Sequence, residues 1–208
     1  KLGIQGVWRG KNKQTTRSRE DQKRADDLVK RNFNADHPDQ LWVSDFTYIQ
    51  THSGWVYTAF IIDVFSRAIV GWKVSTRMNT DMVLDALEQA LHDRGMPKNV
   101  IHHSDRGVQY LSIRYTNRLE AANLRASVGT TGDSYDNALA ETVNGLYKTE
   151  VIEYLKADWQ GLADVQLATL NWVDWFNKKR VHSALGYVSP FEFEAMYYDK
   201  INPLGKVA

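Results

Sequence analysis

LWVSDFTYIQ, residues 41–50, begins the most regular stretch of the chain. β-Branched and aromatic residues fill this stretch, which predicts a β-strand, and residues 55–65 and 67–75 have the same character. The turn-like sequence THSG, residues 51–54, separates the first two runs. Three strands joined by such short connections predict an antiparallel meander at the start of the folded core.

Helical and extended segments alternate after the meander. Apolar residues recur at helical spacing from Val83 to Leu91, with Thr80 as the expected N-cap and Gly95 and Pro97 as the stop. The other expected elements are a strand at 100–104, a helix at 112–126, an extended piece at 127–131, a helix from Gly132-Asp133 to about Thr149, a helix at 162–178 and a capped helix start at Ser189-Pro190. This order predicts a layered α/β fold with a mixed sheet.

The composition is that of a globular protein. Of the 208 residues 43% are apolar, and no run approaches the roughly 18 apolar residues of a membrane span, so we expect no membrane partner. Cysteine is absent, which excludes disulfides and thiolate chemistry and fits the cytoplasm. Residues 1–31 carry ten Lys or Arg against four acids, whereas residues 32–147 carry nine against thirteen. A basic arm on an acidic body indicates a polyanion partner, and a solvated tail is the alternative.

Asp45 lies in the middle of the first strand. Leu41, Val43 and Ile49 flank it on one face and aromatic residues occupy the other, so both faces are expected to be largely buried. Burying a carboxylate costs several kcal/mol unless it is paired or binds a metal. Asp45 therefore needs a cation, or else backbone hydrogen bonds. Asp63, at the end of the second strand, is the alternative to Asp45 as the first metal-binding acid, but its position fits a turn cap.

Two further acids lie where sites often form. Asp105 ends the strand at 100–104, and Gly107 permits close backbone approach there, although an Asp before Arg-Gly is commonly a turn residue. Glu141 lies within a helix, and Lys148 follows seven residues later on nearly the same face, which could equally be a solvated helix face. Three acids on separate elements suit magnesium, which prefers oxygen ligands, and two such ions about 4 Å apart support phosphoryl displacement.

Histidines and cations near these acids are weaker candidates. His102 and His103 are neighbours on a strand and point to opposite faces, so one is expected in the core and the other beside the site. The basic cluster of Lys178, Lys179, Arg180 and His182 fits DNA contact or a solvated helix end equally well. Arg106 fits a phosphate contact or an ion pair.

Asn137 and the acids before it lie at the expected helix start. Asp133 and Asp136 fit helix capping, whereas Asn137 is one turn before Glu141 and is a candidate for DNA contact or a structural role. Trp172, Trp175 and Phe176 are expected to pack rather than stack on bases.

Four passages in order resemble the DDE transposases of the IS-three insertion-sequence family, whose core is similar to that of retroviral integrases. They are LWVSDFTYI at 41–49, HHSDRGVQY at 102–110, GDSYDNALAE at 132–141 with NGLYK at 144–148, and WFN at 175–177 with Arg180, His182, LGY at 185–187 and Pro190. The 35 residues between Asp105 and Glu141 match the interval of this family, as does the position of Lys148.

This resemblance implies an RNase H-like α/β fold with a mixed five-stranded sheet flanked by helices and a helical C-terminal extension. It implies Asp45, Asp105 and Glu141 as the catalytic ligands of two Mg²⁺ or Mn²⁺ ions, and DNA end cleavage and strand transfer as the activity. We expect DNA as the partner, a homo-multimer on DNA, a bacterial, nucleoid-associated protein, and Lys148 as a DNA contact. A ribonuclease H or resolvase, or an inactive DNA-binding relative, are the alternatives.

Three regions are expected along the chain. Residues 1–35 form a basic arm that resembles the tail of an upstream helix-turn-helix region, residues 36–155 the catalytic core and residues 156–208 a helical extension. Because most of such an upstream region is missing, we expect the chain to be a fragment or a second reading-frame product.

Overall fold

The computed structural model describes residues 25–30, 32–105, 107–129, 137–155 and 158–202. Its centre is a five-stranded sheet in the order β3-β2-β1-β4-β5. The strands are β1 (Leu41–Thr51), β2 (Gly54–Asp63), β3 (Ile69–Ser75), β4 (Ile101–Ser104) and β5 (Arg125–Val128). β1 pairs antiparallel with β2 and parallel with β4, so the predicted meander and mixed sheet are confirmed.

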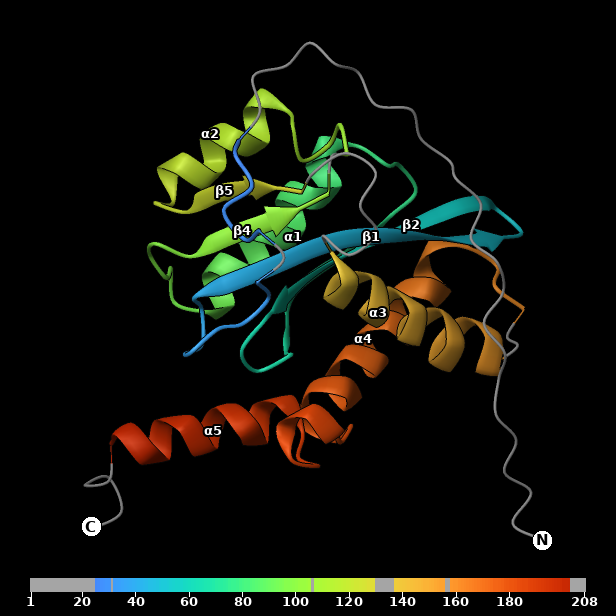
Figure 1. Cartoon of the computed structure of the whole chain (residues 1–208). Helices are drawn as coiled ribbons and strands as arrows, with labels where there is room; N and C mark the ends of the chain where they lie inside the picture. Colours follow the sequence, from blue (N-terminus) through green and yellow to red (C-terminus); the bar gives the residue numbers. More distant parts are fainter. Residues whose placement is uncertain (1–24, 31, 106, 130–136, 156–157, 203–208) are drawn as a thin grey trace, which may run out of the picture.

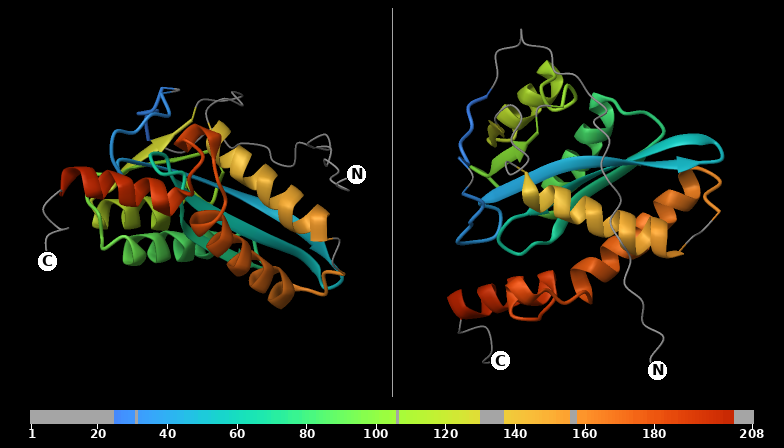
Figure 2. Two further views of the ribbon diagram at one scale, coloured as in Figure 1. Left: turned by 90° about the horizontal axis from the view of Figure 1, so that it is seen from below. Right: turned by 45° about the vertical axis from the view of Figure 1, so that its right-hand side comes forward.

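Helices cover both faces of the sheet (Figures 1 and 2). One apolar cluster joins the sheet to α1 (Thr80–Asp93) and α2 (Ile113–Ala121), and includes Trp42, Ile61 and Leu87. The other joins the opposite face to α3 (Ala138–Tyr147), the π-helix η1 (Lys148–Glu153) and α4 (Leu162–Lys178). β1 therefore lies between two cores, as its apolar pattern predicts, and Asp45 itself is half-buried between Ser44 and Phe46.

β3 and α1 approach each other closely at Gly71. A Cβ atom at this position would lie 2.3 Å from the carbonyl oxygen of Ala86 and 2.9 Å from the Cβ of Ala90. Only glycine allows this contact, which seats α1 against the sheet.

Several predicted boundaries differ from the structure. The helix expected from Gly132-Asp133 to about Thr149 is α3, which begins at Ala138 and gives way to η1 at Lys148; Gly132 and Asp133 lie outside the described residues. Local backbone conformation and hydrogen bonding explain two further differences. Asn79, not Thr80, is the N-cap of α1, since its side chain accepts from the backbone N–H of Met82. The helix expected at 112–126 has Ser112 as its N-cap but ends at Ala121, because Asn123 adopts a left-handed conformation (φ 56°) and leads the chain into β5.

The C-terminal part is helical, as predicted. After α4 come the short 3₁₀ helix η2 (Ser183–Leu185) and α5 (Pro190–Ile201), which begins with a capping box between Ser189 and Glu192. Val165 and Phe176 of α4 belong to the same cluster as Val43 of β1, so α4 is integrated into the core. The boundary expected at residue 155 remains a prediction. Among the described residues, no helix has the length and apolar character to span a bilayer.

Candidate active site

Asp45 projects from β1 toward α3. Its Oδ1 accepts from the backbone N–H of Phe46 at 2.8 Å, and its Oδ2 accepts from the side-chain amide of Asn144 at 2.9 Å. Burial, and then the charges of Asp105 and Glu141, raise the pKa of Asp45 to about 8 against the lowering effect of the two hydrogen bonds. The carboxylate therefore lies in a region with excess negative charge.

Asp105 lies beside Asp45 because β1 and β4 are parallel neighbours. Ser44 pairs with Ser104, so the two aspartates follow paired residues at the same end of the sheet. The backbone N–H of Gly107 donates to Oδ1 of Asp105 at 2.9 Å. A Cβ at Gly107 would lie 2.9 Å from that same oxygen, so glycine is required for this arrangement. Burial raises the pKa of Asp105 despite this hydrogen bond and the nearby His103.

Glu141 comes from α3, on the face of the sheet that carries Asp45. Burial raises its pKa, and the charge of Asp105 raises it further. Charge interactions thus connect the three acids, although they come from the middle of β1, the end of β4 and a helix. In the part of the chain that the structure describes, no group of three Asp, Glu or His side chains lies close enough together to hold a metal ion as it stands.

Two asparagines of α3 fix it to β1. Asn144, which lies three residues after Glu141 and was not among the predicted site residues, donates to Asp45; its spacing from Glu141 and Lys148 places all three on one helix face. Asn137 is buried and donates to the carbonyl of Ser44 at 2.9 Å instead of capping its own helix. This contact favours the structural role for Asn137, and a DNA contact stays a prediction.

Lys148 lies at the junction of α3 and η1. Its ammonium group is 4.6 Å from the ring centroid of Tyr48, and it interacts favourably with the charge of Asp45. Burial lowers its pKa. The Lys148 side chain therefore lies between Asp45 and the ring of Tyr48 on the exposed side of β1.

The rival and neighbouring residues have structural partners. Asp63 accepts from the backbone N–H and hydroxyl of Ser66, which is the turn-capping role expected. His102 contacts Tyr115 on the α1 and α2 side, whereas His103 contacts Ser127, so the two rings do separate. Burial lowers the pKa of His102 to about 3, which keeps it neutral.

The predicted basic cluster also makes internal contacts. Arg180 pairs with Glu150 at 2.8 Å, and Lys178 pairs with Asp174 one helical turn earlier. The His182 ring packs edge-on against Phe176. Lys179 is exposed. These contacts favour structural roles for Arg180 and His182, and DNA contact by the basic cluster stays a prediction. Arg106, Asp133 and Asp136 lie outside the described residues.

A large pocket of the described chain lies away from the three acids. It has a volume of about 850 Å³ between η1 and α4, is mainly apolar, and includes Trp159, Trp172 and Trp175. Trp172 and Phe176 are buried, as expected, but Trp175 is 43% exposed at this pocket. None of the three acids lines it.

Two family models match the chain, and each describes an integrase core domain, over residues 35–134 and 122–190. The chain resembles the HTLV-2 integrase catalytic core domain solved with magnesium (18% identity, 77% of this chain and 99% of that one, TM-score 0.61). It also resembles a chain of the simian T-cell lymphotropic virus intasome (15% identity, 86% and 60% covered, TM-score 0.65). The fold is therefore that of an integrase catalytic core, which is RNase H-like.

Closer relatives are bacterial transposases. The transposase for insertion sequence element IS629 of Shigella sonnei is 56% identical over 200 residues, covering 96% of this chain and 66% of that protein. The putative transposase for insertion sequence element IS986/IS6110 of Mycobacterium tuberculosis is 51% identical over 95% of this chain and 73% of its own length. Transposase InsF for insertion sequence IS3A of Escherichia coli is 38% identical over 82% of this chain and 59% of its own length.

These matches define the class as polynucleotidyl transferases with an integrase core. The chain belongs to the IS-three family of insertion-sequence transposases. It spans about two thirds of the length of the IS629 relative. This membership decides against the ribonuclease H and resolvase alternatives.

Proposed function

We propose that this chain carries out metal-dependent cleavage of element-end DNA and strand transfer, with Asp45, Asp105 and Glu141 as the catalytic metal ligands. The observation that carries the proposal is the convergence of these acids from β1, the end of β4 and α3, where desolvation raises the pKa of each carboxyl and the charge of Asp105 also raises those of Asp45 and Glu141. Among the described residues, no ion pair neutralises any of the three.

The donor set fits magnesium or manganese. All three side chains offer carboxylate oxygens, the ligand type that hard divalent cations prefer. A bound cation would also relieve the repulsion that raises the pKa of Asp45. When bound, a pair of such ions would activate the attacking oxygen and stabilise the leaving oxygen of an in-line displacement at phosphorus.

The chain's own residues supply position and charge. Gly107 holds one oxygen of Asp105 through its N–H, and Asn144 holds one oxygen of Asp45, which fixes the orientation of both carboxyls. Lys148 lies close enough to the charge of Asp45 to bind a phosphate of DNA laid across the acids.

The phosphodiester reactions need no protein nucleophile. In cleavage, water attacks phosphorus and the 3′ oxygen leaves as a hydroxyl. In strand transfer, that hydroxyl attacks a phosphodiester of the target, and the target strand's own 3′ oxygen leaves as a hydroxyl. The relatives named as transposases support this assignment. The solved HTLV-2 core with magnesium supports the choice of metal. The intasome relative supports a multimer on DNA, with terminal repeats and target DNA as ligands.

The test replaces Glu141 with Gln and measures joining of a pre-cut element end to plasmid DNA in Mg²⁺. We expect joining to fall below detection while DNA binding and thermal unfolding stay close to those of the unsubstituted protein. Glu120→Gln, on the opposite face of the sheet, serves as the matched control and should retain activity. Magnesium-dependent joining by the Glu141→Gln variant would refute the assignment. If the unsubstituted protein binds DNA but does not join it, the chain would instead be an inactive DNA-binding relative.

A further inference from the structure

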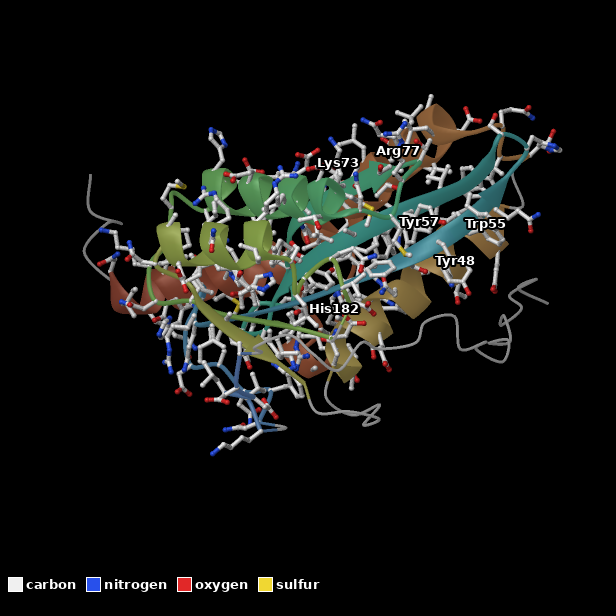
Figure 3. All side chains as sticks on the ribbon, turned by 90° about the horizontal axis from the view of Figure 1, so that it is seen from above. Tyr48, Trp55, Tyr57, Lys73, Arg77 and His182 are labelled. Carbon is white, nitrogen blue, oxygen red and sulfur yellow. The ribbon has the colours of Figure 1, made fainter. Side chains whose placement is uncertain are left out.

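One part of the sheet is left uncovered by helices. Beyond the ends of α1 and α2, the far halves of β1 and β2 carry Tyr48, Trp55 and Tyr57 on the same face (Figure 3). Tyr48 is paired across the strands with Tyr57, and Trp55 follows two residues from Tyr57 along β2. We call these three residues the aromatic strip.

The aromatic strip is accessible to solvent. Trp55 is 50% exposed, and Tyr48 and Tyr57 are half-buried. The rings of Tyr48 and Trp55 meet edge to face with centroids 5.3 Å apart, so they do not cover each other's faces. Aromatic rings held in this way on a sheet can stack on the bases of an unpaired strand, because every base has a π-face.

Cations border the aromatic strip. Lys148 lies over the ring of Tyr48 on one side. Arg77 and Lys73 lie toward β3 on the other side (Figure 3), and Lys73 is bound to Asp85 at 2.8 Å. Among the described residues, no carboxylate forms an ion pair with Lys148 or Arg77. Basic side chains around exposed aromatic rings match a phosphate backbone with accessible bases.

The aromatic strip and the three acids lie on opposite faces of the sheet and approach each other at Lys148. Asp45 projects to the face that carries α3, Tyr48 projects to the other face, and Lys148 lies over the Tyr48 ring while it interacts with the charge of Asp45. At about 3.3 Å per residue, Tyr48 lies roughly 10 Å from Asp45 along β1, and Gln50, the partner of Trp55, about 17 Å. At about 3.4 Å per nucleotide these spacings correspond to roughly three to five nucleotides.

We propose that the aromatic strip binds unpaired DNA bases about three to five nucleotides from the phosphate held at Asp45, Asp105 and Glu141. The inference rests on the proposed function, because it places the scissile phosphate at those acids. Duplex DNA buries its base faces in the stack, so it would contact the cations but not the rings. The occupant is therefore a frayed or single-stranded segment adjoining the reaction site.

The experiment uses 2-aminopurine, whose fluorescence falls when it stacks on an aromatic ring. Element-end DNA carries the probe at single positions one to ten nucleotides from the scissile phosphate, in each strand, with the terminal bases either paired or mismatched. All measurements use the Glu141→Gln background, so that cleavage does not alter the DNA. We expect quenching at positions three to five of mismatched ends and none at positions eight to ten.

Substitutions separate stacking from folding. Trp55→Ala should remove the quenching and weaken binding to mismatched ends about 5- to 100-fold, with little effect on paired ends, whereas Trp55→Phe should restore both. Trp175→Ala is the matched control, because Trp175 has similar exposure, 43%, on the opposite side of the sheet. Its variant should bind and quench like the parent.

The possible failures are distinguishable. Quenching that persists in Trp55→Ala, or equal loss of affinity for paired and mismatched ends, would overturn the stacking role while leaving the proposed function intact. A Trp55→Ala variant that changes oligomeric state and not quenching would assign the strip to contact between copies. Failure of the parent protein to bind element-end DNA would overturn the proposed function, and the inference with it.

Discussion

At the scale of single residues, Asp45 is the most informative group. Its pKa of about 8 in the folded protein is far above the ordinary value of 3.8, chiefly through burial and then through Asp105. The folded state therefore binds the Asp45 proton more tightly than the unfolded state does. It follows that the metal-free protein loses stability as pH rises from about 4 to 8, the interval in which only the unfolded state is fully ionised.

Replacing Asp45 with Asn should remove this penalty. In the presence of a chelator, we expect Asp45→Asn to melt at a higher temperature than the unsubstituted protein, with a gap that grows from pH 4 to pH 8. A protein of this size gains about 2–4 °C per kcal/mol. Asp81→Asn, an exposed acid paired with Arg114, is the control and should show no such trend. A gap independent of pH would contradict the raised pKa.

Gly107 gives a second prediction at this scale. Its φ angle is not in the left-handed region, so alanine fits the backbone, but the added Cβ would lie 2.9 Å from Oδ1 of Asp105. The flexible carboxyl can move away from this contact, and we expect the fold to survive while the acid is displaced. A displacement near 1 Å costs up to about 100-fold in rate. Gly107→Ala should therefore lower the strand-transfer rate by about that factor with an unchanged melting temperature. A normal rate would show that this contact does not position Asp105.

At the scale of elements, the joint between α3 and β1 is the critical contact. The side chain of Asn137 reaches Ser44, 93 residues earlier in the sequence, and Asn144 reaches Asp45, 99 residues earlier. Local patterns predicted the strands and the limits of α4 because alternation and helical periodicity are properties of neighbouring residues. The partners of the two asparagines depend on packing between distant segments. For that reason the sequence indicated their helix but not the role of Asn144.

The Asn137 contact can be tested by stability. Asn137→Ala leaves the buried carbonyl of Ser44 without this donor, and an unmatched buried polar group costs about 1–3 kcal/mol. We expect a loss of that size in the free energy of unfolding, measured by urea denaturation. Thr142→Ala on the exposed side of the same helix should change it by less than about 0.5 kcal/mol. Equal losses of stability in Asn137→Ala and Thr142→Ala would mean that the hydrogen bond from Asn137 to Ser44 contributes little to stability.

At the scale of the whole molecule, the order and spacing of the four sequence passages predicted which acids make up the candidate site. The 35-residue interval and the four passages predicted that Asp45, Asp105 and Glu141 belong together, and the structure brings their charges within range of one another. Sequence spacing could not reveal how α5 is held against the sheet. That depends on Arg94, which contacts Asp39 before β1 and Glu194 on α5, three residues far apart in the chain.

Arg94 makes the last prediction. It donates to Asp39 at 2.8 Å and to Glu194 at 2.7 Å, and all three side chains are at most 17% exposed. Removing one partner of a buried ion pair leaves uncompensated charge and costs about 3–5 kcal/mol. Arg94→Met should lower the free energy of unfolding by that amount in urea denaturation. Arg114→Met breaks an exposed pair with Asp81 and should cost at most about 1 kcal/mol. Similar losses in the two variants would show that the buried network does not hold α5 to the core.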